Sequence, residues 1–163
     1  RRRRHPVVRV HPCLDALADG TPAPGGGSAA AYSGAAGAAL VSMMARLTVG
    51  RKKYADVDEI MRTILERSEN LRTELTAAIE EDAAAFNAVL EAFMLPKDKP
   101  EEKAARDQAI QAATLTAARV PLTVAAKAVE VIQMAAQAVT MGNLNAISDG
   151  PERAMGFASS LDG

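Results

Sequence analysis

Residues 21–48, TPAPGGGSAAAYSGAAGAALVSMMARLT, carry the clearest structural signal in the sequence. The early prolines and glycines of this stretch exclude a helix or strand interior, so they predict a loop. Ser28 is a favourable N-cap, and the small, apolar residues after it predict a central helix over 29–48. Gly34 and Ala38 leave so little side chain that neighbouring helices can approach closely. We therefore expect other helices to pack tightly around this one.

Helical periodicity continues toward the C-terminus. A short helix is expected at 11–18. Hydrophobic residues spaced three, four or seven apart, among them Ile60, Phe86 and Phe93, form a stripe that predicts a long helix from Asp56 or Asp58 to about Phe93. A third long helix is expected from about Glu101 to the Gly142-Asn143 stop, either kinked or divided at Pro121. The predicted fold class is all-α: a bundle of three or four long antiparallel helices with a Gly-rich loop before the central helix.

The composition narrows the function classes. The 163 residues suffice for one core, and a net charge of −1 with 3% aromatic residues gives no general attraction to nucleic acid or to an anionic membrane. Ser28–Ala45 is an uncharged run, but its Ala, Gly and Ser residues gain too little on transfer to drive membrane insertion. With two His and one Cys, Cys13, we expect no metal site, no disulfide and a cytoplasmic location.

The ends of the chain differ from its middle. Four arginines open the sequence, and residues 1–9 are expected to be a disordered tail or the edge of a fragment. Residues 10–163 are expected to form a single helical domain.

Two features could bind or transform a ligand. The glycines of Gly25–Gly27, with Ser28, precede a helix N-terminus, where backbone N–H groups favour an anion; the alternative is a flexible linker followed by an N-cap. Asp82 lies on the hydrophobic stripe of the second long helix, where a carboxylate is either ion-paired or functional. The candidate ion-pair partners are Arg106, Arg119 and Lys127.

Two further groups are less distinctive. Residues 143–149, NLNAISD, form a polar segment, although Asp149 with Glu152 also fits a capping box. Arg51, Lys52 and Lys53 form a basic group that could equally be a solvated helix end.

Taken in order, five segments resemble the cyclodeaminase/cyclohydrolase family of folate enzymes. They are TPAPGGGSAAA at 21–31, LTVGRKKY at 47–54, DAAAF at 82–86, LPK at 95–97 and GNLNAISD at 142–149. The resemblance implies an all-helical homodimer that acts on the one-carbon unit between N5 and N10 of tetrahydrofolate, without a further cofactor. It also implies more helices after the Ser-Asp pair, which residues 150–163 do not resemble, so a C-terminal truncation stays open.

The resemblance suggests roles for the candidate residues. Asp82 and Asp149 would be catalytic carboxylates; Gly25, Gly26, Gly27 and Ser28 would receive the pterin or the glutamate carboxylates; and Arg51, Lys52 and Lys53 would hold a polyglutamate tail. The leading activity is hydrolysis of 5,10-methenyltetrahydrofolate to 10-formyltetrahydrofolate. The alternatives are the ammonia-releasing 5-formiminotetrahydrofolate cyclodeaminase and a non-catalytic bundle that binds a folate or a protein partner.

Overall fold

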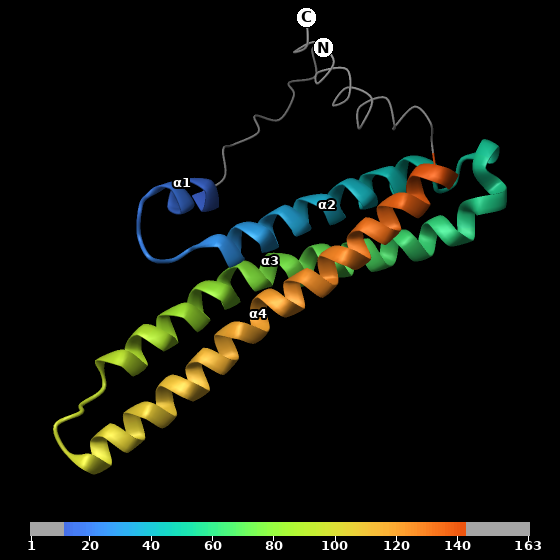
Figure 1. Ribbon diagram of the computed structural model, residues 1–163. Coiled ribbons are helices and arrows are strands. Elements are labelled where there is room, and N and C mark those ends of the chain that lie inside the picture. Colours follow the sequence, from blue (N-terminus) through green and yellow to red (C-terminus); the bar gives the residue numbers. More distant parts are fainter. Residues whose placement is uncertain (1–11, 143–163) are drawn as a thin grey trace, which may run out of the picture.

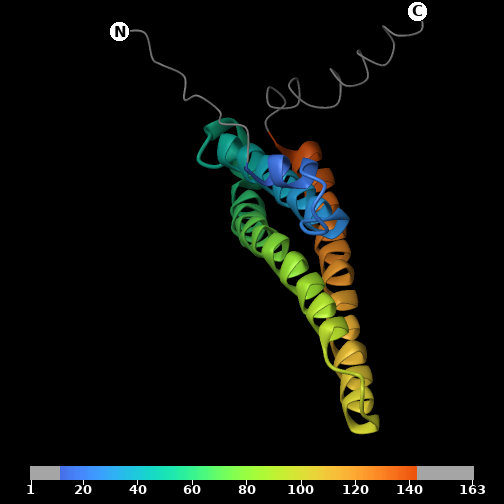
Figure 2. The ribbon, with the colours of Figure 1, turned by 90° about the vertical axis from the view of Figure 1, so that its left-hand side faces the viewer.

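The computed structural model describes residues 12–142, and all regular structure in this range is helical. The elements are α1 (Pro12–Ala18), α2 (Gly26–Thr48), the 3-10 helix η1 (Lys52–Val57), α3 (Asp58–Met94) and α4 (Pro100–Met141). The three long helices run alternately in opposite directions, and α3 and α4 form a hairpin that extends beyond the start of α2 (Figures 1 and 2). The predicted all-α bundle is confirmed.

The α2–α3 pair is built on small residues. Six of the buried positions on α2 alternate in steps of three and four, and so do six of those on α3. On α2 they include Ser28, Ala31, Ala35, Ala38, Ser42 and Ala45, and on α3 Met61, Ile64, Ser68, Leu71, Leu75 and Ala78. Asp82 is the next position of the α3 series, so the regular spacing of the buried face carries a carboxylate to the start of α2.

Hydrogen bonds fix the register of this pair. The hydroxyls of Ser42 and Ser68 lie 2.8 Å apart, and Ser28 Oγ lies 2.9 Å from Asp82 Oδ2. About four helical turns separate the two bonds on each helix, forwards along α2 and backwards along α3, as antiparallel packing requires.

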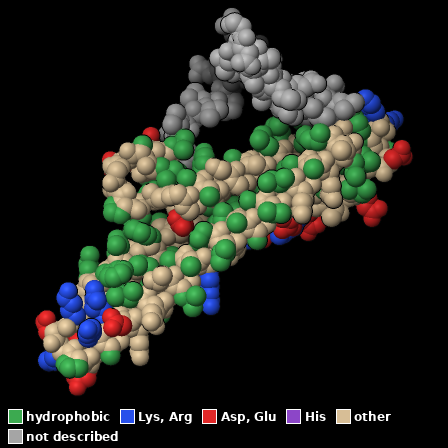
Figure 3. Space-filling view, viewed as in Figure 1, with side chains coloured by type: hydrophobic (Ala, Val, Ile, Leu, Met, Phe, Trp, Pro, Cys, Tyr) green, Lys and Arg blue, Asp and Glu red, His purple; other side chains and the backbone are tan. Residues whose placement is uncertain are grey.

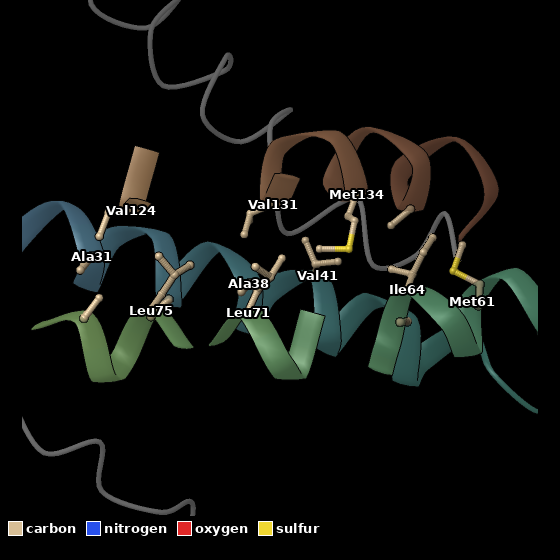
Figure 4. Close-up of a cluster of buried hydrophobic side chains, with 14 residues drawn as sticks. Ala31, Ala38, Val41, Met61, Ile64, Leu71, Leu75, Val124, Val131 and Met134 are labelled. Carbon is tan, nitrogen blue, oxygen red and sulfur yellow. The ribbon is translucent and has the colours of Figure 1, made fainter. Parts of the chain in front are cut away.

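The core confirms the predicted close approach of helices to α2. Val41, Leu71, Leu75, Val131 and Met134 converge between the three long helices (Figure 4). A Cβ added to Gly34 would lie 3.2 Å from Leu75 Cδ1, and one added to Gly37 would lie 3.3 Å from Val131 Cγ1. Larger side chains at these two glycines would push the helices apart.

Three expectations about the helices need correction. The central helix begins at Gly26, so Ser28 is inside the first turn and its hydroxyl bonds to α3 instead of capping α2. Helix α4 is continuous through Pro121, so of the two alternatives, a kink or a division, the division is wrong. Ile60, Phe86 and Phe93 belong to the expected hydrophobic stripe of α3 but are exposed, and Phe86 and Phe93 lie where the hairpin extends beyond the start of α2.

Large apolar side chains are exposed over α2 and α4 (Figure 3). On α2 these are Leu40, Met43 and Leu47, all on one face. On α4 they form the α4 apolar stripe, which we define as Leu115, Leu122, Val129 and Ile132. In the far half of the hairpin, between Ala78 on α3 and Val124 on α4, Ala92 is the one described residue of these helices that is buried.

The composition of α2 also bears on membranes. By length and hydropathy alone this helix could cross a bilayer, but core helices of folded domains meet the same criterion. Its small side chains pack against α3 and α4 in the way of a core helix.

Candidate functional site

A pocket of about 300 Å³ lies where the start of α2 meets the α3–α4 hairpin. The loop before α2, which contains a cis peptide bond between Ala23 and Pro24, forms one wall with the start of α2. The two helices of the hairpin form the other wall. Its lining residues are Pro22, Ala23, Gly25, Gly26, Gly27, Asp82, Phe86 and Ala117. The structure therefore brings the predicted glycine loop and the predicted carboxylate into one pocket.

Asp82 is half-buried and is not part of an ion pair within the described residues. Lys127, one of the expected partners, instead lies 3.1 Å from Glu74 Oε2. Arg106, another, donates to the carbonyl oxygen of Phe93 at 3.1 Å. The Asp82 carboxylate instead accepts a hydrogen bond from Ser28, which is completely buried. The expected ion pair between Asp82 and a basic residue of the next helix is thus not formed within the described residues.

Gly27 makes room for this carboxylate. A Cβ at Gly27 would overlap Asp82 Oδ1 and would lie 2.5 Å from Asp82 Cγ. The carboxylate therefore lies directly against the first turn of α2, whose leading N–H groups have no partner within the helix and carry the positive end of its dipole. The pocket is therefore bordered by a carboxylate that can exchange a proton, Asp82, and by the N-terminus of α2, which favours anions.

The basic residues lie elsewhere. Arg51 and Lys52 line a second, more open hollow of about 320 Å³ with Gly50, Ala55 and Asp58. The N–H of Gly50 donates to Asp58 Oδ1 at 2.6 Å and, together with Arg62, lowers the Asp58 pKa. The 23 residues of α2 separate this hollow from the Asp82 pocket by roughly 35 Å. A single chain does not bring the two predicted groups together.

The remaining basic residue, Lys53, holds its ammonium 5.4 Å from the Tyr54 ring centroid. A role for Arg51, Lys52 or Lys53 in substrate binding stays a prediction. Asp149 and the rest of the 143–149 segment lie outside the described residues, so their part in a site also stays a prediction.

Phe86, a residue of the hydrophobic stripe expected from the sequence, lines the pocket. Its side chain is 40% exposed, one helical turn after Asp82. The signal was present in the i, i+4 spacing, because two residues at that distance share a helix face.

Comparisons with known proteins agree with this architecture. Residues 9–161 match the model of the family described as formiminotransferase-cyclodeaminase. The chain is 53% identical over 136 residues to a methenyltetrahydrofolate cyclohydrolase of Methylorubrum extorquens, covering 83% of this chain and 65% of that protein. It is 39% identical over 127 residues to the formimidoyltransferase-cyclodeaminase of Mus musculus, covering 78% of this chain and 24% of that one.

A solved structure shares the fold. The crystal structure of formiminotetrahydrofolate cyclodeaminase from Thermotoga maritima aligns with a TM-score of 0.70 at 32% identity, covering 83% of this chain and 64% of that chain. This chain thus spans less than two thirds of the length of each of these relatives. The family-model match over residues 9–161, together with these relatives, establishes that the chain belongs to the formiminotransferase-cyclodeaminase family.

Proposed function

We propose that this chain hydrolyses 5,10-methenyltetrahydrofolate to 10-formyltetrahydrofolate, with Asp82 as the catalytic carboxylate. The observation that carries the proposal is the placement of Asp82 in a pocket with Gly25–Gly27 and Phe86. The relative named as a cyclohydrolase, at 53% identity, supports hydrolysis over the alternative.

The chemistry of the substrate suits an isolated carboxylate. The bridging carbon of the methenyl group is the centre of an amidinium cation, and water must add to this carbon. A nearby negative charge stabilises the cation. Asp82 accepts a proton from the attacking water as the new carbon–oxygen bond forms, and later releases this proton to solvent. The hydroxyl proton of the adduct ends on N5 as the carbon–N5 bond breaks, leaving the formyl group on N10.

The pocket wall suits the rest of the ligand. Phe86 offers an apolar aromatic surface for the bicyclic pterin, one turn from Asp82. The glycine loop allows the ligand to approach the backbone of Gly25 and Gly26 closely, because neither has a side chain in the way. Asp149 would be a second carboxylate, and no further cofactor is required.

The cyclodeaminase is the second candidate, favoured by the likeness to the formiminotetrahydrofolate cyclodeaminase of Thermotoga maritima. There N10 would attack the formimino carbon and ammonia would leave, with proton transfer at the same carboxylate. The test is a pair of assays on the purified chain: loss of methenyl absorbance without added ammonia supports the hydrolase, and ammonia release from the formimino substrate supports the deaminase. Folate binding without either reaction would contradict both and leave a non-catalytic binding bundle.

We further propose a homodimer in the cytoplasm. The exposed face of α2 and the α4 apolar stripe present large apolar side chains to water at helical spacing, and symmetric pairing of two copies would cover them. The far half of the hairpin, with Ala92 as its one described buried residue on α3 and α4, likewise needs a neighbour. A second copy could also bring Arg51–Lys53 toward a partner's pocket, which a single chain does not do.

A further inference from the structure

We propose that Ser28 is a positioning residue that holds the Asp82 carboxyl group in one place in both its charged and its neutral form. This inference rests on the catalytic role proposed for Asp82 and assigns to Ser28 a part other than the substrate contact expected from the sequence. It is carried by two contacts of a single buried hydroxyl group.

The first contact serves the charged form. Ser28 Oγ lies 2.9 Å from Asp82 Oδ2 and can donate its proton to the carboxylate. Ser28 is 0% exposed, so no water competes for this bond and the hydroxyl has little freedom to leave it. Within the described residues, the Asp82 side chain makes no hydrogen bond other than this one. Its Oδ1 atom can therefore accept a hydrogen bond from a ligand or a water.

The second contact serves the neutral form. Ser28 Oγ also lies 3.1 Å from the carbonyl oxygen of Ile79, one turn before Asp82 on α3. When Asp82 has taken up a proton, its O–H can donate to Ser28 Oγ, and Ser28 can turn its own proton to the Ile79 carbonyl. Both hydroxyl and carboxyl therefore stay paired before and after proton transfer, without movement of either helix.

Gly27 completes the arrangement from the other side. Because a Cβ at Gly27 would overlap Asp82 Oδ1, the carboxyl group is confined between the Gly27 backbone and the Ser28 hydroxyl. A carboxyl fixed in this way does not have to be reoriented during each turnover, and misplacement of a catalytic group by about 1 Å can cost on the order of 100-fold in rate.

The same helix provides a matched control. Ser42 is 1% exposed and shares a 2.8 Å hydrogen bond with Ser68, so Ser42→Ala also removes a buried interhelical hydroxyl. It does so about four turns, or roughly 21 Å, from the pocket. A purely structural role for Ser28 would make the two alanine variants behave alike.

The experiment compares Ser28→Ala, Ser28→Cys, Ser42→Ala and Asp82→Asn by methenyl hydrolysis, with folding checked by circular dichroism. We expect Ser28→Ala to lower kcat roughly 10- to 100-fold with KM changed less than about threefold, and Ser42→Ala to keep the wild-type kcat. Ser28→Cys fills the space of the hydroxyl but is a weak donor, so it should stay close to Ser28→Ala in kcat. Wild-type kcat in Ser28→Ala, or recovery of kcat in Ser28→Cys, would overturn the positioning role.

A spectroscopic readout separates this inference from the proposed function. In protein labelled with carbon-13 at aspartate carboxyls, the Asp82 resonance, identified by its loss in Asp82→Asn, should shift in Ser28→Ala and stay in Ser42→Ala. An unshifted resonance in Ser28→Ala would contradict the positioning role whether or not the chain is active. Undiminished turnover in Asp82→Asn would instead overturn the catalytic assignment while leaving the hydrogen bond itself testable.

Discussion

The carboxylate of Asp82 occupies the space that a side chain at Gly27 would fill. A Cβ there would overlap Oδ1 and lie 2.7 Å from Oδ2, which is too close for either oxygen to keep its place. Gly27 belongs to α2 and Asp82 to α3. Because Gly27 has no side chain, the Asp82 carboxylate can lie against the backbone of α2. Gly27, in the first turn of α2, thus has to be glycine for a reason that is independent of any turn.

Gly27→Ala should therefore displace the Asp82 carboxylate. Because the added methyl meets the movable end of a side chain, we expect the helices to form and methenyl hydrolysis to fall roughly 100-fold. Circular dichroism and steady-state kinetics measure the two effects. Gly26→Ala is the control for folding, since its Cβ meets no atom within 4 Å. Equal kcat in the wild type and Gly27→Ala would refute the steric argument.

Asp82→Asn should remove turnover but retain the fold. Asparagine matches aspartate in shape and can keep a hydrogen bond with Ser28, but it cannot accept the proton of the attacking water. We expect kcat to fall about 100-fold or more, with a free energy of unfolding close to that of the wild type. Glu81→Gln, an exposed carboxylate one residue earlier, should be silent in both measurements. Activity per folded molecule that survives in Asp82→Asn would mean that Asp82 is structural.

The sequence was a good guide to the helices because hydrophobic spacing along one helix is a local property. It was a poorer guide to the contacts between helices. Ser28 fits an N-cap by type and position, yet the helix starts earlier and the hydroxyl bonds across to α3. That outcome depends on the register of α2 against α3, which no pattern within either helix specifies. The separation of roughly 35 Å between the Asp82 pocket and the hollow at Arg51 likewise follows from the uninterrupted length of α2.

Gly26→Val should weaken folate binding far more than it changes helix content. The position lines the pocket, and the fold leaves its Cβ in open space, so a larger side chain would occupy volume needed by the ligand without displacing the protein. We expect at least about a tenfold increase in Kd, corresponding to 1.4 kcal/mol. Fluorescence titration with a folate gives the Kd and circular dichroism the helix content. Unchanged affinity would make the loop a connecting segment only.

Glu69 should give the fold a pH-dependent contribution. Hydrogen bonds from Arg72, Arg46 and Ser42 lower the pKa of Glu69 from 4.5 to about 2. A carboxylate whose pKa is lower in the folded state stabilises the fold above its unfolded pKa, and this stabilisation is lost as the pH falls from about 4.5 toward 2. Glu69→Gln should thus be less stable than the wild type at pH 7, by up to about 1 kcal/mol because the pairs are partly exposed.

The difference between Glu69→Gln and the wild type should shrink as the pH falls through this range. Urea unfolding at several pH values measures it, with Glu66→Gln, an exposed carboxylate on the same helix, as the control. A difference that is constant from pH 7 down to about pH 2 would contradict the ion-pair explanation.

Assembly should depend on the α4 apolar stripe. Leu122, in the middle of this stripe, is 70% exposed. Leu115 lies seven residues before it and Val129 seven residues after it, and seven is the repeat of helices that pair side by side. In sedimentation velocity at micromolar concentration we expect the mass of a dimer for the wild type and of a monomer for Leu122→Glu, because a buried unpaired carboxylate is costly. Thr123→Glu adds the same charge to an exposed position about 100° around the helix and should remain a dimer. A monodisperse wild-type monomer would refute the dimer, and dissociation by both variants alike would mean that charge, and not the stripe, controls association.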